Sequence, residues 1–466
     1  MAGERAVFLQ GSLFRHVSVM SLTSSVGLMA VFLVDFVDMI FISMLGKAEL
    51  AAAVGYAGAI LFFTTSFGIG MAIAAGALVA RALGANEVEE ARERASNALI
   101  YGVVFGAVFA ALVWVNLGFL VGLLGASGET AALAVHYLAI IVPSLPLLLM
   151  GMVGGAILRA HGDARRAMMA TIYGGLVNAV LDPILIFGFG WDLTGAALAS
   201  VAARVTIGVV SLLPILRHYG GFSMPTRENL GRDFRPIVAI ALPAILTQLA
   251  TPVGQAYVTR AMAEFGEAAV AGMAIVGRLT PLAFGVIFAL SGAVGPIIGQ
   301  NHGAGQIDRV RGGFNAALAF AGMFVSAVAV VLFGLRGPIN ALFGSEGVTR
   351  ELVNLFCGPL ALLYFFAAAL FVCNAMFNNL GKPFLSTGVN WGRHTIGTIP
   401  FVMLGAAWWG APGVLIGQAF GGVVFGLGAI VLARRVMARA EVVAAGGGAE
   451  PFQRQRRLLQ LFHNRR

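Results

Sequence analysis

The feature that most constrains this chain is a series of apolar runs, each long enough to cross a lipid bilayer, that recurs along nearly all of its 466 residues. A transmembrane helix needs about 20 mainly apolar residues, because the hydrocarbon core is about 30 Å thick and a helix rises about 1.5 Å per residue. We count twelve such runs, and a charged share of only 11% leaves too little polar sequence for a separate water-soluble domain. The chain is therefore predicted to be an all-α integral membrane protein with twelve transmembrane helices.

The runs form two sets of six. The first set covers residues 17–41, 52–80, 96–124, 131–158, 167–189 and 193–216, and the second covers 237–262, 270–299, 312–335, 352–379, 384–407 and 411–434. We expect a short N-terminal segment 1–16, a first lobe 17–216, a linker 217–236, a second lobe 237–434 and a basic tail 435–466. The tail is predicted to be a disordered arm or a surface helix attracted to anionic lipid.

The two sets resemble each other in sequence at a shift of 219 to 220 residues. "ALGANEVEEARERASNAL" (82–99) aligns with "NHGAGQIDRVRGGFNAAL" (301–318), and "LGKAELAA" (45–52) aligns with "FGEAAVAG" (265–272). A repeat of this kind indicates duplicated architecture. Because each copy has six spans, both copies enter the membrane in the same direction. We expect two pseudo-symmetric lobes, related by an axis along the membrane normal, with a cleft between them.

The net charge of +9 is distributed unevenly between the two sides of the membrane. Segments assigned to the cytoplasm hold 23 of the 30 lysines and arginines, whereas the opposite loops hold Lys47, Arg260, Arg336 and Arg350. Positive residues favour the cytoplasmic side, so both termini are predicted to be cytoplasmic, with the protein in the inner (plasma) membrane. The same distribution argues against a nucleic-acid partner. The expected partners are the bilayer and a small molecule, and the protein is expected to be a monomer.

Acidic residues inside two spans are the strongest functional signal. Asp35 and Asp38 are three positions apart in the first span, and Asn178 and Asp182 are four apart in the fifth, so each pair lies on one helix face. A carboxylate at mid-membrane depth costs about 2.5 to 3.5 kcal/mol on insertion scales, so these acids are expected to serve a function. Pro183, directly after Asp182, has two equal interpretations: it loosens the helix backbone beside that acid, or it only kinks the helix.

No acid occupies the equivalent positions of the second lobe. Gln255 stands opposite Asp35, and the positions opposite Asp38 and Asp182 hold Val258 and Phe401. The ion-binding site is therefore predicted in the first lobe, where burial and mutual repulsion favour a carboxyl group that holds a proton. Carboxylate and amide oxygens at Asp38, Asn178 and Asp182 also suit Na⁺. The alternative is a structural role, in which these acids pair with a buried cation, for which Arg204, Arg278 and Arg393 are the candidates.

Signals of catalysis are weak. The sequence has no phosphate-binding loop and no cluster with the spacing of metal ligands, so no cofactor or bound metal is expected beyond the coupling ion, H⁺ or Na⁺. Aspartates on two spans suggest an intramembrane aspartyl protease as an alternative of a different class, but the Gly-x-Gly-Asp pattern is absent and the nearest string is "AHGD" (160–163). The protein is not expected to be an enzyme.

Four strings together resemble the multidrug and toxic compound extrusion (MATE) transporters over about residues 10 to 435. They are "VDMIFISMLGKAELAAAVG", "ALVARALGANEVEEA", "VNAVLDPILIFGFGWDLTGAALAS" and "GPIIGQNHGAGQIDRV". The resemblance implies twelve helices in two lobes, a cleft that opens alternately to the two sides, and export of amphipathic, often cationic compounds in exchange for protons or sodium.

The sequence is most similar to the DinF-type branch of that family. The resemblance implies an essential acid at Asp38 and roles in the same site for Asn178 and Asp182, with Ser200 and Tyr137 as further polar cavity residues. Asp35 falls where the family often carries Asn. Gln255 stands where the NorM-type branch carries an acid in the seventh span, so a second-lobe cation site of that kind is not expected, and Gln255 is a candidate polar residue of the substrate cavity instead. The first span has no proline, and we expect no bend there.

The predicted function is a secondary antiporter that works by alternating access. The closest rival is a lipid-linked oligosaccharide flippase of the same superfamily, which would offer a strongly cationic cavity for pyrophosphate. Channel activity is a lesser alternative. The identity of the substrate does not follow from the sequence, because the shape of the cavity depends on side chains whose positions the sequence does not give.

Overall fold

The computed structural model describes residues 6–445, and the regular structure in this range is helical. The first half contains α1 (Leu13–Met44), α2 (Ala48–Gly84), α3 (Val88–Val115), α4 (Leu117–Leu123), α5 (Gly128–Ile141), the 3₁₀ turn η1 (Val142–Ser144), α6 (Leu145–Ala160), α7 (Ala164–Pro183), the π-helical turn η2 (Ile184–Gly188) and α8 (Asp192–His218). The second half contains α9 (Arg227–Ala263), α10 (Glu267–Gly303), α11 (Ile307–Leu342), α12 (Gly347–Leu355), the π-helical turn η3 (Phe356–Leu360), α13 (Ala361–Asn379), α14 (Pro383–His394) and α15 (Ile399–Ala445).

These elements make the twelve predicted crossings. Eleven helical stretches of the described chain are long and apolar enough to span a membrane, and the last of them, Pro383–Val442, contains two crossings. The chain reverses at Gly410, whose φ of 65° lies in the left-handed region that favours glycine. The protein is thus an all-α integral membrane protein with the predicted fold class.

Glycines allow the two arms of the last hairpin to touch through their backbones. A side chain on Gly421, Gly417 or Gly413 would collide with the carbonyl oxygen of Gly397, Phe401 or Gly405, respectively. These glycines recur every four residues on α15, which is the spacing of close helix contacts in membranes. The eleventh and twelfth crossings therefore form an antiparallel pair held at a short distance.

The turns reproduce the duplication inferred from the sequence. Six residues with positive φ in the first half have counterparts in the second at the same shift of 219 to 220: Gly46 and Gly266, Asn86 and Gly305, Gly125 and Gly344, Gly128 and Gly347, Gly162 and Gly381, Gly190 and Gly410. The two copies therefore turn at equivalent places, and the two lobes are pseudo-symmetric.

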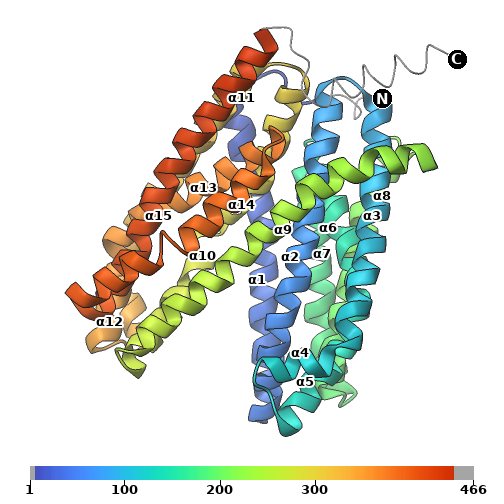
Figure 1. The fold of residues 1–466 in the computed structure, drawn as a ribbon. Helices are drawn as coiled ribbons and strands as arrows, with labels where there is room; N and C mark the ends of the chain where they lie inside the picture. Colours follow the sequence, from blue (N-terminus) through green and yellow to red (C-terminus); the bar gives the residue numbers. More distant parts are fainter. Residues whose placement is uncertain (1–5, 446–466) are drawn as a thin grey trace, which may run out of the picture.

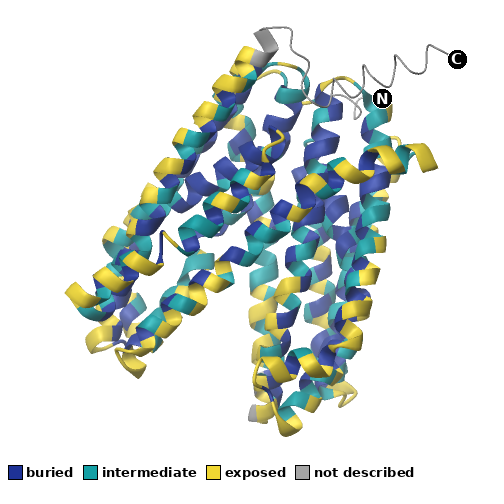
Figure 2. Cartoon of the chain, in the orientation of Figure 1, coloured by how far each residue is buried: buried dark blue, intermediate teal, exposed yellow. Residues whose placement is uncertain are grey.

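The lobes lie close together at one end of the molecule and spread apart towards the other (Figure 1). Both ends of the described chain lie at the end where the lobes meet, which we call the termini side, and the opposite end is the distal side. Buried residues follow the inner faces of the helices, whereas exposed residues cover the outside and both ends (Figure 2). Many exposed residues are large and apolar, such as Leu112, Val330 and Met403, as expected for a surface in contact with lipid.

Two glycines at equivalent positions close the termini side. Gly84 at the end of α2 lies against the backbone of Gln300, and Gly303 at the end of α10 lies against the backbone of Arg81. The amide of Gln300 also joins both lobes, because its Oε1 accepts from the backbone N–H of Phe8 at 2.9 Å and its Nε2 donates to the carbonyl oxygen of Ala160 at 2.8 Å. The duplicated loop motif thus forms a symmetric contact between the two lobes.

Further contacts between the lobes extend to about the middle of the crossings. On α10, Gly285 lies against Met29 of α1, and on α2, Gly70 lies against Ile245 of α9. Beyond these contacts, towards the distal side, residues of α1 such as Asp35 and Met39 are exposed. The structure therefore represents a conformation that is closed at the termini side and separated at the distal side.

Helix ends differ from the apolar runs at two places that bear on the predicted domain bounds. The seventh crossing begins at Arg227, inside the expected linker, and α15 continues to Ala445, past the expected end at residue 434. Helices extend beyond the apolar core because their ends are hydrogen-bonded at the membrane surface, where polar residues are tolerated. The first crossing, α1, is one uninterrupted helix, as expected. The remainder of the predicted basic tail, 446–466, lies outside the described residues.

Candidate functional site

Glycines bring the first and fifth crossings together. Gly27 of α1 lies against the backbone of Met168, and Gly175 of α7 lies against Val34. Small residues let membrane helices approach where larger side chains would hold them apart. The acid-bearing faces of α1 and α7 consequently face each other.

Asp38 of α1 and Asp182 of α7 meet at this contact. Their carboxyl groups lie within hydrogen-bonding reach of each other. Asp182 is almost completely buried, with 1% of its surface exposed, and Asp38 is half-buried. No other donor in residues 6–445 reaches either oxygen of Asp182 or Oδ1 of Asp38. A carboxylate is only an acceptor, so a hydrogen bond between two carboxyl groups requires one proton. The close contact between the two carboxyl groups is therefore favourable only when a proton or another cation lies between them.

The backbone is irregular directly beside Asp182. Pro183 ends α7, and the chain continues in the π-helical turn η2. Proline lacks the N–H that would bond to the carbonyl oxygen four residues earlier, so the regular bonding pattern cannot continue through it. Single π-helical turns are frequent at functional sites. Of the two interpretations of Pro183, the π-helical turn agrees with a locally loosened backbone.

Tyr137 and Ser200 complete the cluster from two further helices. Tyr137 of α5 is hydrogen-bonded to Ser200 of α8 and lies near enough to Asp38 and Asp182 to interact with their charges. Arg204, one turn after Ser200, donates from Nη1 to the carbonyl oxygen of Ile141 at 3.0 Å and to Oγ of Ser144 at 2.9 Å. Four crossings thus enclose the acid pair.

The other predicted residues lie at different distances from this pair. Asn178 is one turn before Asp182, and its buried Nδ2 has no partner in the described chain. Asp35, one turn before Asp38, interacts electrostatically with it but is exposed. Gln255 lies in the second lobe, where its Oε1 accepts from Nε2 of Gln418 at 3.0 Å. The structure therefore does not bring Gln255 together with the first-lobe cluster.

Pairing with a buried cation does not account for the two central acids. Arg204, Arg278 and Arg393 were the candidate partners, and none of them forms an ion pair with Asp38 or Asp182 within residues 6–445. Arg204 uses its Nη1 on a carbonyl and a hydroxyl oxygen instead. The negative charge of the cluster is thus available to a mobile cation.

The second lobe contains buried polar groups that sequence reasoning did not single out. Asn390 of α14 donates to Oδ1 of Asn374 on α13 at 2.9 Å, and Ser386 donates to Oδ1 of Asn378 at 3.3 Å. These amides lie at helical spacing on their spans, so a search for amide and hydroxyl residues at that spacing would have found them. The second lobe therefore contains a group of neutral hydrogen-bonding side chains, at positions that are not equivalent to those of the acids in the first lobe.

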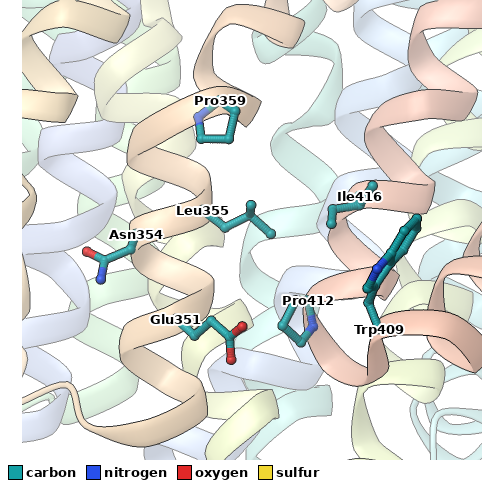
Figure 3. A pocket seen from close by; sticks show the side chains of 7 residues that line it. All are labelled: Glu351, Asn354, Leu355, Pro359, Trp409, Pro412 and Ile416. Atoms are coloured by element: carbon teal, nitrogen blue, oxygen red, sulfur yellow. The ribbon is translucent and has the colours of Figure 1, made fainter.

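A pocket of about 400 Å³ lies near the distal end of the second lobe (Figure 3). Two segments that face each other across the pocket supply its lining. The continuous segment α12–η3 contributes Glu351, Asn354, Leu355 and Pro359, and α15 contributes Trp409, Pro412 and Ile416. Its volume falls within the range of small-molecule sites. None of the predicted site residues lines it.

Comparison with known proteins gives consistent matches. The sequence pattern of the MatE family matches residues 24–184 and 243–404. A FAD transporter of Shewanella oneidensis is 28% identical over 433 residues, which cover 90% of this chain and 93% of the relative. The multidrug export protein MepA of Staphylococcus aureus is 23% identical over 356 residues, which cover 74% of this chain and 77% of the relative.

Solved structures show the same fold. The Vibrio cholerae MATE transporter VcmN in the bent form has a TM-score of 0.87 and 26% identity, and the match covers 93% of this chain and 98% of that chain. A multidrug resistance MATE transporter in an outward-facing conformation has a TM-score of 0.86 at 23% identity, over 94% of this chain and 98% of that chain. The second of these supports the fold alone.

Proposed function

The chain belongs to the MATE family of multi-pass membrane transporters, and on that premise we propose that it is an antiporter which exports small amphipathic compounds in exchange for protons. As a member of this family it is a transporter and not an enzyme. The proposed location is the inner (plasma) membrane, with both termini in the cytoplasm, as a monomer.

The pair formed by Asp38 and Asp182 is the observation that supports proton coupling. Two carboxyl groups that lie within hydrogen-bonding reach of each other, and whose buried oxygens have no other donor bonded to them within residues 6–445, favour the state in which they share a proton. When that proton leaves, two like charges remain in a site of low polarity, which is unfavourable. Loss of the proton would therefore be coupled to binding of a cation or to a rearrangement of α1 against α7.

The conformation suggests which step of the cycle this structure represents. If the termini are cytoplasmic, the separated distal side faces outwards, and the contacts at Gly84 and Gly303 close the inner side. A proton that enters from outside binds to the acid pair, and the change at α1 and α7 weakens the binding of cargo. The protonated protein then opens inwards, releases the proton and binds new cargo, so that the two sides exchange access.

Sodium is the alternative coupling ion. Asp38 and Asp182 supply carboxylate oxygens and Asn178 an amide oxygen, which are the ligand types that hard cations prefer. The contact between the carboxyl groups of Asp38 and Asp182 supports a proton instead, because one shared proton bridges two carboxyl groups directly. This contact is the reason to propose the proton before sodium.

Two classes of cargo are supported by relatives. MepA of Staphylococcus aureus is a multidrug export protein, which agrees with amphipathic, cationic drugs or toxic metabolites as cargo. The Shewanella oneidensis relative is a FAD transporter and aligns over more of this chain, so a flavin nucleotide is the second candidate.

Transport by purified protein in proteoliposomes tests the proposal. We expect uptake of a fluorescent amphipathic cation or of FAD to follow an imposed proton gradient, and Asp38→Asn to abolish this response. Uptake that follows only a sodium gradient would show that the coupling ion is sodium and not the proton. Scrambling of a pyrophosphate-linked lipid without transport of either compound would instead favour the flippase.

A further inference from the structure

Arg393 occupies a place in the second lobe where a charge is costly. It lies in the last turn of α14, ten residues from the start of that helix, which corresponds to about 15 Å at about 1.5 Å per residue. This is about half of the 30 Å hydrocarbon core. An arginine at such depth is unfavourable by at least about 2.5 kcal/mol unless it has a partner or a function.

A break in the eleventh crossing holds Arg393 in position. The helix stops at His394, the chain turns over residues 395–398, and α15 starts at Ile399. Oγ1 of Thr398 donates to the carbonyl oxygen of Arg393 at 2.9 Å, which satisfies a backbone group left free by the break. Discontinuous helices near the bilayer centre are typical of cargo and ion sites in transporters.

The guanidinium of Arg393 has no partner in the described chain. Within residues 6–445 no carboxylate lies within ion-pair distance of it, and no hydrogen bond from its side chain is formed. Its Nε and Nη2 lie beside Gly422 of α15, where the missing side chain leaves room for the planar group. The side chain is only half-buried, although it lies within a lobe. None of its nitrogen atoms is among the fully buried side-chain atoms of the described chain that lack a partner, so each nitrogen keeps some accessible surface.

Aromatic rings lie next to this cation. Tyr364 of α13 interacts electrostatically with Arg393 and is stacked on Phe284 of α10, with ring centroids 4.0 Å apart. Phe288, one turn further along α10, lies edge-on to Tyr364 at 6.4 Å. A guanidinium beside aromatic rings suits a planar compound with a negative group. Two N–H groups of the guanidinium donate to the anion, while the aromatic rings pack against the planar part of the compound.

The first lobe shows how a structural arginine differs. Arg204 lies in α8 of that lobe, and its Nη1 is bonded to the carbonyl oxygen of Ile141 and to Ser144. Arg393 has no such acceptors. The two arginines occur at comparable depth in pseudo-symmetric lobes, so the difference is specific to Arg393 and is not a general feature of arginines in this fold.

We infer that Arg393, together with Tyr364, binds the anionic group of an aromatic cargo molecule, such as a carboxylate, sulfonate or phosphate, in the second lobe while the first lobe handles the coupling ion. The inference rests on the proposed transport function and specifies the class of cargo. Lipid headgroups carry the same chemistry, but they lie at the membrane surface, about 15 Å from this depth.

Matched probes of opposite charge test the inference. We would measure binding of 1-pyrenesulfonate and 1-pyrenemethylammonium to the purified full-length protein by fluorescence anisotropy, and their uptake into proteoliposomes made of neutral lipid only. Arg393→Gln should weaken binding of the sulfonate by about tenfold or more, because a charge-assisted hydrogen bond is lost. Binding of the ammonium probe should be unchanged or slightly stronger.

Two further variants separate binding from folding. Arg393→Lys keeps the positive charge but cannot donate two parallel hydrogen bonds to one anion. Its affinity for the sulfonate should therefore lie between those of the wild type and Arg393→Gln. Arg350→Gln makes the same change at an exposed arginine on α12 and should affect neither probe. Each variant would first be checked for a single symmetric peak in size-exclusion chromatography.

The outcomes distinguish this inference from the proposed function. Equal binding of the sulfonate by the wild type and Arg393→Gln would overturn the inference, as would equal losses for both probes. If the Arg393→Gln effect on sulfonate binding is present but no probe moves with an ion gradient, the anion site stands and the antiport proposal fails. If ion-driven uptake occurs without any Arg393 effect, the antiport proposal stands and the anion site fails.

Discussion

The two lobes share one scaffold and differ in the charges inside it. The first lobe holds Asp38 and Asp182, whereas the equivalent positions of the second lobe hold the apolar residues Val258 and Phe401. The second lobe instead contains amide pairs such as Asn390 with Asn374, and Arg393, whose guanidinium has no partner within residues 6–445. The turns agree between the copies at all six paired positions. The comparison teaches that backbone turns and glycine contacts preserve the duplicated fold, while a few buried side chains give each copy its own chemistry.

The largest expected effect concerns the acid pair. Asp38→Asn and Asp182→Asn should each reduce ion-driven efflux to background, because an amide can neither release the shared proton nor carry the charge that a cation binds. The measurement is uptake of a fluorescent substrate into proteoliposomes under a proton gradient.

Asp192→Asn is the matched control for both acid variants. It makes the same change in the same lobe, but at an exposed residue that forms an ion pair with Lys47. It should retain transport near the wild-type level. Full ion-driven transport by Asp38→Asn would contradict the proposal that the acids of the first lobe couple transport to the ion.

The second expected effect concerns the hairpin within α15 of the second lobe, whose two arms touch through their backbones at glycines. Gly421→Leu places a side chain against the backbone of Gly397 and should destabilise the protein by about 3 kcal/mol or more. Gly428→Leu lies two turns further along α15 with open space around it, so its effect should be within about 0.5 kcal/mol. Thermal unfolding of the detergent-solubilised protein measures both, and equal effects would contradict the contact.

The third effect tests the symmetric contact at the termini side. Gly84→Val and Gly303→Val insert side chains against the backbones of Gln300 and Arg81, and each should disfavour the closed arrangement by about 1 to 3 kcal/mol. Thiol labelling of Met29→Cys, in a background without Cys357 and Cys373, reports the opening, since Met29 packs against Gly285 of the other lobe. Faster labelling in only one variant would show that the two repeats do not contribute equally.

The smallest effect concerns a helix cap that only the first lobe contains. Asp163 precedes α7 and accepts from the backbone N–H of Arg166 at 3.0 Å, from Nη1 of Arg166 at 2.6 Å and from the hydroxyl of Tyr219 at 2.7 Å. The equivalent residue of the second lobe is Lys382, which makes no such cap. Asp163→Ala should cost about 1 kcal/mol at neutral pH, and Lys382→Ala much less.

The pH dependence of this cap has a defined sign. The hydrogen bonds from Arg166 and Tyr219 hold the pKa of Asp163 below its ordinary value of 3.8. A carboxyl group with a lowered pKa in the folded state stabilises that state fully above its unfolded pKa and loses the contribution as the pH falls through the folded pKa. The difference in melting temperature between wild type and Asp163→Ala should therefore be full at pH 7 and shrink below about pH 4. A difference that persists at low pH would contradict this assignment.

Much of the architecture follows from local sequence patterns. Apolar runs of about 20 residues give the twelve crossings, and the aligned motifs near Gly84 and Gly303 reveal the duplication. The acids of the first lobe are recognisable because charge at membrane depth is rare and costly. The sequence alone does not show that Asp38 and Asp182 meet, because that depends on how closely the glycines of α1 and α7 let the two helices approach.

The actual partners of two polar residues did not follow from the sequence, for a physical reason. Gln255 is symmetric with Asp35, but symmetry of sequence does not place a residue in the same site when its neighbours differ, and here Gln418 satisfies it. Arg393 was one of three candidate partners for the acids under the alternative of a structural role, but those acids lie in the other lobe. Contacts between distant segments decide such pairings, and helical periodicity carries no information about them.

The sequence by itself determined the membrane class, the twelve helices, the duplication and the lobe that carries the acids, because these depend on local hydropathy and on spacing along one helix. The tertiary structure alone decided that the lobes close at the termini side, that two carboxyl groups come within reach of one shared proton, and that Arg393 has no partner in the part of the chain that the structure describes. These properties arise from packing between segments far apart in the chain, where a backbone contact at a single glycine sets which side chains can touch.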